Sequence, residues 1–154
     1  AWAEGGSSIF SKEKFLELGG FDELYSPFYW EDIDISYRAW KNGYKVLFDP
    51  NILVDHQHES TISTYFSSKT IKKISYRNQL IFIWKNITDI KLIISHCLLL
   101  IPNIIILLLK GEFEFISGFL SALSKINKIY KQRKGQIKSY LLTDQEVFNS
   151  INEK

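Results

Sequence analysis

FYWEDIDISYRAWKNG, residues 28–43, is the stretch that decides the fold, because a strongly patterned helix is followed at once by a change of period. Ile33, Tyr37 and Trp40 recur at the i, i+4, i+7 spacing of one helix face. We therefore expect a helix from about residue 31 to residue 42 that buries this face and ends at Gly43.

The residues after Gly43 alternate with a period of two. Apolar Tyr44, Val46 and Phe48 lie on one face of an extended chain, and Pro50 closes the pattern, as is typical of a β-strand. Residues 51–55 read as a second short extended segment. A helix followed by strands predicts an α/β fold for this half of the chain.

Upstream, the sequence predicts a short helix over 12–18, with Ser11 as its N-cap and Gly19 as its stop. Phe10 and Phe15 occupy the two positions of a hydrophobic staple across the start of that helix. Gly5-Gly6 and Gly19-Gly20 are interpreted as turns. They are also positions where a ligand could approach the backbone closely.

Downstream of residue 60 the pattern is helical. We expect one or two amphipathic helices over 65–84, an apolar helix over 92–109, and a further apolar stripe between residues 116 and 130 with basic neighbours. The chain is therefore divided into a region 1–60 with mixed structure and a helical region 61–154. No signal peptide is visible at the start, and Cys97 is expected to be a packed thiol.

Charge is distributed unevenly between these regions. Residues 1–60 hold 5 Lys and Arg against 11 Asp and Glu, whereas residues 61–154 hold 14 against 6, within a net charge of only +2. Because the basic residues accompany long apolar runs, an anionic membrane surface is a better expected partner than nucleic acid.

The run 92–109 has no charged residue, and 13 of its 18 residues are Leu or Ile. It falls just short of the roughly 20 residues that span a bilayer upright, and Pro102-Asn103 interrupts its middle. We expect a helical hairpin or interfacial helices, with a single span and a buried core helix as the alternatives.

The densest polar cluster is Glu31-Asp32-Ile33-Asp34, directly behind the aromatic run 28–30. Acidic residues in a first turn often only stabilise the positive end of the helix dipole. Flanking aromatic rings that exclude water would instead raise a carboxyl pKa and suit it to accept a proton. Asp34 and Arg38 are spaced as an i, i+4 ion pair on another face, so substitution of Asp34 is expected to be mild.

Asp32-Ile33-Asp34 also spells D-x-D, a pattern associated with metal-bound nucleotides. We reject that assignment because side chains two apart on a helix point about 200° apart. His56 and His58 would share a face of an extended segment, but no further Cys or His completes a structural zinc site.

Taken in order, these motifs resemble the C-terminal half of the catalytic domain of family 2 glycosyltransferases, which are inverting enzymes with a GT-A fold. The motifs are Gly5 to Phe10, Gly19 to Glu23, Glu31 to Arg38, Gly43 to Val46, and Pro50 to His56. The later part resembles bacterial members, with Arg77-Asn78 followed by an apolar stretch and a basic helix that ends near Gln136.

The resemblance implies a role for each matching residue. Asp32 corresponds to the general base that accepts the proton of the acceptor hydroxyl, with Glu31 beside it. Gly5 and Gly6 would shape the acceptor side, and Asp22, Trp30 and Arg38 are further candidates for substrate binding. His56 corresponds to a histidine that binds the divalent metal, Mg²⁺ or Mn²⁺, on the donor diphosphate.

The implied function is transfer of a sugar from a nucleotide-sugar donor to a glycan or lipid-linked acceptor at the cytoplasmic face of a bacterial inner membrane. The family's front half, which holds most of the nucleotide, is missing, so this fragment is expected to be inactive alone and to need the front half for its metal. A non-catalytic membrane-tethering module is the main alternative, followed by a metal-dependent hydrolase that uses Asp32, His56 and His58.

Overall fold

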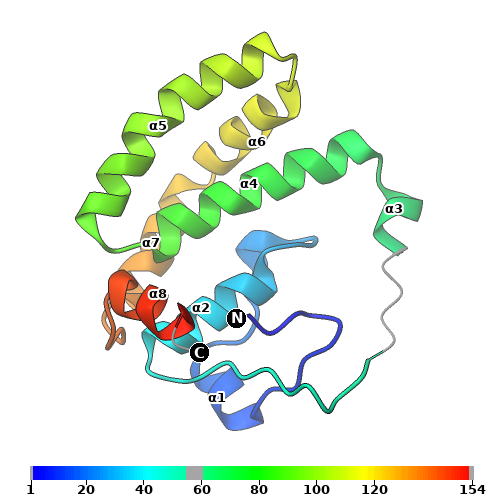
Figure 1. Ribbon diagram of the computed structural model, residues 1–154. Coiled ribbons are helices and arrows are strands. Elements are labelled where there is room, and N and C mark those ends of the chain that lie inside the picture. Colours follow the sequence, from blue (N-terminus) through cyan, green and yellow to red (C-terminus); the bar gives the residue numbers. More distant parts are fainter. Residues whose placement is uncertain (1, 55–60, 153–154) are drawn as a thin grey trace.

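The computed structural model describes residues 2–54 and 61–152, and within these ranges every regular element is a helix. The long helix α4 lies at the centre of Figure 1, with α5 and α6 on one side of it and α1 and α2 on the other. The elements are α1 (Lys12–Glu17), the 3-10 helix η1 (Glu23–Tyr25), α2 (Glu31–Lys41), α3 (Thr61–Tyr65), α4 (Ser68–Asn86), α5 (Ile90–Leu109), α6 (Phe113–Leu123), α7 (Ile126–Gln136) and α8 (Asp144–Asn152).

The α/β prediction, and with it the GT-A half-domain, is wrong for this chain, because the described residues form no strand. Residues 44–48 belong to neither a helix nor a strand, because a strand needs a partner for its backbone N–H and C=O groups and none lies beside them among the described residues. Leu47 and Phe48 are left 82% and 83% exposed. The strand predicted from the alternating pattern is therefore wrong.

The two expected helices of the first half are confirmed. α1 follows Ser11, although the Ser11 side chain makes no capping hydrogen bond. The rings of Phe10 and Phe15 pack edge to face with centroids 5.4 Å apart, as the staple predicts. α2 buries Tyr37 and Trp40, the face expected from the spacing.

The helical half differs from the expectation in where its helices begin and end. The expected one or two helices over 65–84 correspond to α4, which begins three residues later, directly after its N-cap Ser67, whose side chain accepts from the Thr70 amide, while the short α3 ends at Tyr65. α5 continues through Pro102, so no hairpin forms at that residue. The turn comes instead at Gly111, where φ is +74° and α5 gives way to α6.

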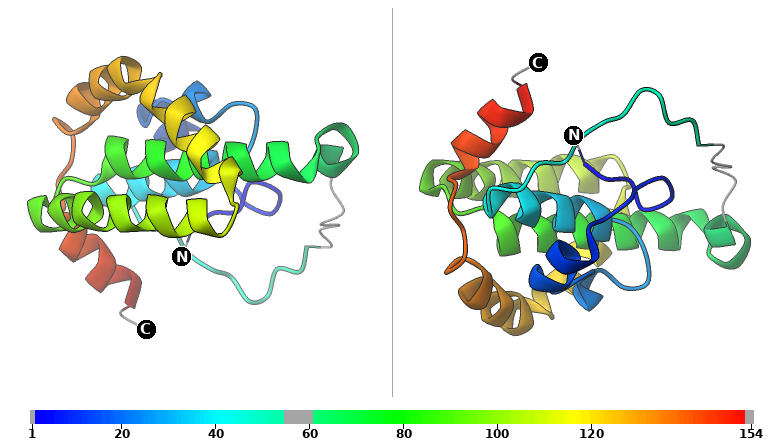
Figure 2. Two further views of the ribbon diagram at one scale, coloured as in Figure 1. Left: turned by 90° about the horizontal axis from the view of Figure 1, so that it is seen from above. Right: turned by 90° about the horizontal axis from the view of Figure 1, so that it is seen from below.

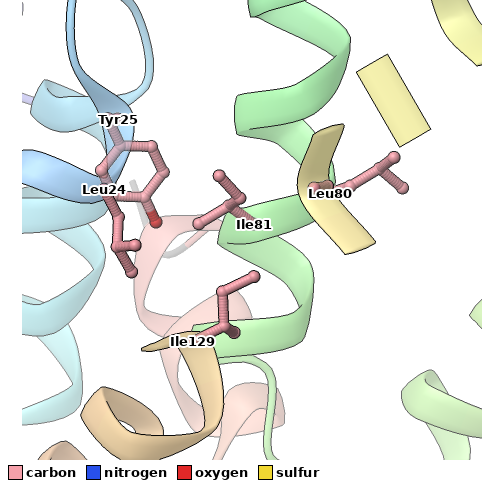
Figure 3. Close-up of a cluster of buried hydrophobic side chains, with 6 residues drawn as sticks. Leu24, Tyr25, Leu80, Ile81 and Ile129 are labelled. Atoms are coloured by element: carbon pink, nitrogen blue, oxygen red, sulfur yellow. The ribbon is translucent and has the colours of Figure 1, made fainter. Parts of the chain in front are cut away.

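The apolar core is built around α4. Leu80 and Ile81 of α4 pack with Leu24 and Tyr25 of η1 and with Ile129 of α7, as Figure 3 shows. A second cluster joins α2 to the start of α5 and to Val147 of α8. Both clusters include Phe82 at their edges, so α4 ties the acidic first half of the chain to the basic second half.

α5 is the element that contributes least to the core. It is 20 residues long with a mean hydropathy of 2.6, and none of its most apolar window is buried. Its attachment to the body includes a hydrogen bond of 3.1 Å from the Trp84 indole to His96 and packing of Leu100 against the core. One described helix is thus long and apolar enough to cross a membrane.

Candidate functional site

The acidic cluster is presented by an unusual backbone turn. Tyr29 and Trp30, directly before α2, have φ of +68° and +77°, a left-handed region that bulky residues rarely adopt. Such a conformation costs on the order of 1–3 kcal/mol for each residue and persists only where the surroundings hold it. Because Trp30 is the left-handed residue that precedes the helix, α2 begins directly after this turn, with Glu31 and Asp32 as its first two residues.

Two side chains of α4 hold this turn. The buried Asn78 amide donates to the carbonyl oxygens of Tyr25, Phe28 and Tyr29 at 2.7 to 2.9 Å. Arg77 donates to the carbonyl of Ser26 at 2.6 Å. Because these carbonyls are satisfied by α4, the strained turn is stabilised in one conformation, and the first turn of α2 is fixed with it.

Asp32 is half-buried and faces the Gly5-Gly6 turn. Its Oδ2 accepts from the Gly5 amide at 3.3 Å, and its Oδ1 accepts from the Ile33 amide at 2.8 Å. Among the described residues, no lysine or arginine side chain forms an ion pair with this carboxylate. A carboxylate held only by amides keeps lone pairs available for a hydroxyl proton.

Glu31 is placed differently. Its Oε2 is buried and has no hydrogen-bond partner in the described part of the chain. Burial raises the pKa of the Glu31 carboxyl, and the nearby charge of Asp32 acts in the same direction. The side chain lines a small cavity of about 210 Å³ whose other walls come from residues 21–28.

Asp34, on the same turn of helix, is fully buried and serves the fold. Its carboxylate binds the side chains of Lys85 and Arg38, each at 2.8 Å, and also accepts from Tyr25 and Asn86. Burial alone would raise the pKa of Asp34, but Lys85 and Arg38 lower it below its ordinary value. The predicted pair with Arg38 is confirmed, and the rejection of a D-x-D metal site agrees with the separate surroundings of Asp32 and Asp34.

Asp22 and Arg38 support the loop before the site. Asp22 caps η1 by accepting from the Leu24 amide at 2.9 Å and forms an ion pair with Lys85. Arg38 donates to the carbonyls of Leu18 and Gly20, besides Asp34. Asp22 and Arg38 thus have an observed role in holding the fold. Both side chains also line the larger of two cavities, and their contact with substrate stays a prediction.

Of the remaining candidates, Trp30 is half-buried and its ring packs against Phe82 of α4 with centroids 5.5 Å apart. Gly6 lies exposed in the turn that faces Asp32. The structure thus brings Gly5, Glu31 and Asp32 together, with Trp30 at the helix start.

The predicted metal ligand His56, like His58, lies outside the described residues. Within the described ranges no group of three or more His, Cys, Asp or Glu side chains could hold a metal ion. These residues therefore do not by themselves fit the divalent ion that the resemblance implies, and the metal stays a prediction.

A larger cavity of about 890 Å³ opens beside this site, between the turn 17–23 and α7. α7 contributes Lys128, Lys131, Gln132, Gly135 and Gln136 to its wall. The larger and smaller cavities share Phe21, Asp22 and Glu23, so they adjoin at this turn.

No protein-family model, curated protein or solved structure matches this chain. The resemblance to family 2 glycosyltransferases is therefore carried by the motifs of this chain alone.

Sequence reasoning placed the acidic pair but missed what supports it. Arg77-Asn78 was recognised only as part of the resemblance to bacterial members, and no role was predicted for Lys85. A signal was available for Lys85, because it stands among the apolar residues Ile83, Trp84 and Ile87, and a lysine that is buried in such surroundings requires an acid partner.

Proposed function

We propose that this chain forms the acceptor side of an inverting sugar transferase related to family 2 glycosyltransferases, with Asp32 as the general base. The observation that carries the proposal is the left-handed turn at Tyr29 and Trp30, which Asn78 holds and which presents Asp32 toward Gly5. Strained backbone held by buried hydrogen bonds is concentrated at functional sites. A helix cap alone would not require such a turn.

The chemistry needs one base on this side. The acceptor hydroxyl oxygen forms a bond to the anomeric carbon, its proton passes to Asp32, and the bond from that carbon to the donor diphosphate breaks with its electron pair on the diphosphate oxygen. Glycosidases, by contrast, use two carboxyl groups because their leaving group must be protonated. Glu31, whose pKa is raised by burial, lies next to Asp32 at the start of α2, and its buried oxygen without a partner among the described residues is a candidate for a hydrogen bond to the acceptor.

The donor nucleotide and the divalent ion are assigned to parts of the protein outside the described residues. The sugar acceptor is proposed to be a polysaccharide or glycolipid of the cell envelope, because such acceptors are presented at a membrane and α5 offers an apolar helix for membrane attachment.

The site is proposed to work at the cytoplasmic face of a bacterial inner membrane. α5 and α6 lie on the side of α4 opposite to α1 and α2 in Figure 1, so attachment through α5 would leave the acidic turn facing away from the lipid core. Attachment of α5 along the interface agrees with its packing against the body at Trp84.

Asp32→Asn tests the catalytic role. The substitution keeps the shape and most of the capping ability of the side chain while removing the proton acceptor, so folding should survive. In a protein that contains this chain and transfers sugar, loss of the general base should lower turnover by roughly 10²–10⁴-fold. Release of nucleoside diphosphate from uridine-, guanosine- and thymidine-diphosphate sugars, with membrane extract as acceptor, gives the readout.

Asp49→Asn serves as the matched control, because the Asp49 carboxylate is exposed and accepts from the backbone and side-chain nitrogens of the neighbouring Asn51. It should leave turnover near normal. Donor affinity should be unchanged in both variants, since Asp32 acts on the acceptor. Near-normal turnover of a folded Asp32→Asn protein would falsify the assignment and return the acidic pair to helix capping.

A membrane-tethering module without catalysis is the second candidate, and the exposed α5 favours it. Membrane binding and sugar transfer, measured on the parent protein and on Asp32→Asn, distinguish the two functions. A tether binds membranes and transfers no sugar from any of the donors, and Asp32→Asn then binds membranes as well as the parent protein does.

A further inference from the structure

α7 and the residues on either side of it carry a run of cations without acids. Six Lys or Arg side chains lie between residues 115 and 143, and no Asp or Glu lies among them. None of the six forms an ion pair with an acidic side chain of the described ranges. A surface whose positive charge is not compensated in this way attracts an anionic partner.

Two of the six cations fix α7 to the body of the protein. Arg133 donates to two carbonyls at the end of α4, those of Trp84 and Lys85, at 3.1 and 3.2 Å. Lys125 donates to a carbonyl of η1 at 3.1 Å, and Ile129 of α7 is buried in the core. α7 therefore has one orientation, with a defined inner side and a defined outer side.

The outer side of α7 is amphipathic. Lys131, Lys134 and Lys138, the last in the turn that follows the helix, recur at the i, i+3, i+7 spacing of one face, and all three are exposed. Beside this stripe lie Ile126 and Tyr130, which are one turn apart and also exposed, Tyr130 to 65%. Cations on one edge and apolar side chains on the other are the pattern of a helix that lies on a membrane surface.

The apolar edge continues onto α6. Phe113, Leu120 and Leu123 are exposed on the face of α6 opposite to the one that packs on α4. α6 also contacts α5, and the left view of Figure 2 shows it crossing α4 between α5 and α7. The helices α5, α6 and α7 thus follow one another across α4, and each of them exposes apolar side chains.

This combination of charge and apolar surface favours lipid over the other polyanions of a cell. Nucleic acid would engage the lysines through its phosphates but would leave Leu120 and Ile126 in water. A bilayer offers anionic headgroups to the cations and acyl chains to the apolar edge at the same time. The same headgroups repel the first part of the chain, where residues 1–60 hold 11 Asp and Glu against 5 Lys and Arg.

We propose that the outer side of α7 is a second membrane contact, which selects anionic lipid. In it Lys131, Lys134 and Lys138 bind lipid phosphates, while Ile126 and Tyr130 enter the apolar boundary beneath them. The proposal rests on the membrane attachment that is part of the proposed function and divides that attachment between two helices. α5 supplies affinity for any bilayer, and α7 supplies the preference for negative charge.

Replacing the three lysines of this stripe by Gln tests the proposal. Flotation is measured with vesicles of phosphatidylcholine, with and without phosphatidylglycerol. Because each cation near an anionic surface strengthens binding about fivefold, the triple variant should partition onto the anionic vesicles more weakly by on the order of 10²-fold. Its partitioning onto neutral vesicles should be unchanged, and thermal melting checks that it folds.

Lys12, Lys14 and Lys45 provide the matched control. All three are exposed, and Figure 1 shows α1, which carries the first two, on the other side of α4 from α5 and α6. Their replacement by Gln removes the same three charges and should keep the preference of the parent protein for anionic vesicles. Equal losses in the two triple variants would assign the preference to net charge, and an unchanged preference in the α7 variant would assign it to another surface. Either result overturns the proposal.

A fluorescent label locates the contact without relying on affinity. The single cysteine, Cys97, is exposed on α5, so it is first replaced by Ser. An environment-sensitive fluorophore on Lys134→Cys should shift to the blue when anionic vesicles are added, and the same fluorophore on Lys45→Cys should not. A label at residue 134 that stays in water while the protein floats with the vesicles would contradict the contact.

Failure of this proposal is distinguishable from failure of the proposed function. A parent protein that floats with neither kind of vesicle contradicts membrane attachment itself, and the α7 contact with it. Equal flotation with both kinds contradicts the α7 contact alone, as does a requirement for the three lysines in binding RNA but not vesicles. Sugar transfer and its loss in Asp32→Asn are measured separately and do not depend on these results.

Discussion

Three carboxylates within four residues have three different environments, and position on the helix explains the difference. Asp34 points into the body, where two cations compensate its burial. Asp32 points toward the Gly5 amide, and Glu31 is half-buried beside the smaller cavity with an oxygen that lacks a partner among the described residues. The acidic cluster that looks uniform in the sequence therefore divides into a structural residue and two candidates for chemistry.

Asp34→Asn is the first prediction at this scale, and it reverses the expectation of a mild effect. Removing the charge leaves Lys85 and Arg38 buried beside a neutral amide, and breaking a buried ion pair in this way costs about 3–5 kcal/mol. We expect a large fall in the free energy of unfolding, measured by denaturant titration of the detergent-solubilised chain.

Glu112→Gln is its control, because Glu112 pairs with Lys72 at 3.4 Å on an exposed surface. Exposed pairs contribute only about 0–1 kcal/mol. Equal destabilisation by the two substitutions would show that the network around Asp34 contributes no more than a surface pair.

At the scale of single residues, the sequence predicted what depends on local spacing. The Asp34–Arg38 pair and the Phe10–Phe15 staple follow from positions along one helix, and both are confirmed. The contacts of Lys85 with Asp22 and Asp34 join residues far apart in the chain, so no local pattern could predict them. The ligands of the left-handed turn, Asn78 above all, were unpredictable for the same reason.

Between elements, the closest packing is that of α6 on α4, and a glycine makes it possible. A Cβ on Gly118 would lie 2.8 Å from the Lys73 carbonyl oxygen and 3.0 Å from the Arg77 amide nitrogen, which are backbone atoms that cannot move without moving α4. Arg77 and Asn78 hold the left-handed turn from this same part of α4. Displacement of α4 by α6 would therefore reach the candidate site.

Gly118→Ala should accordingly destabilise the protein, by about 1–3 kcal/mol as in other overpacked cores. Gly135→Ala is the matched control, because it makes the same chemical change in a helix but enters open space. It should stabilise the protein by about 0.5–1 kcal/mol, since alanine favours the helix more than glycine does. Thermal melting of the two variants side by side tests the pair, and shifts of the same sign would contradict the packing argument.

The element that sequence analysis misjudged most is the segment 44–48. Period-two alternation predicts an extended backbone, but a sheet also requires a neighbouring strand, which a local pattern cannot supply. The helix boundaries near Pro102 were misjudged for a related reason. Proline removes one hydrogen bond, and the long apolar stretch on either side continues the helix through it.

Across the whole molecule, the apolar helix α5 and the helices of the acidic first part of the chain lie on different sides of α4. In the two views of Figure 2, α5 and α6 lie on the face of α4 away from α1 and the start of the chain. Exposed apolar side chains are concentrated on α5, from Ile90 at 64% to Leu109 at 84%. Exposed apolar surface of this extent, on a helix with lysines at both ends, supports the proposed attachment of α5 to a membrane.

Membrane binding through α5 leads to the last prediction. Replacing Leu98 and Ile101, which are 70% and 66% exposed, by Asn should abolish flotation with liposomes of anionic lipid while leaving the fold intact, because these side chains contact little of the body. High salt should only weaken flotation of the parent protein, since screening reduces the attraction of Lys and Arg to headgroups but not the burial of apolar surface. Substitution of Ile81 and Ile129, both buried in the core, should instead unfold the protein. Flotation of the Leu98→Asn, Ile101→Asn variant at the level of the parent protein would assign membrane contact to a surface other than α5, and equal flotation with neutral and anionic liposomes would remove the contribution of the basic residues.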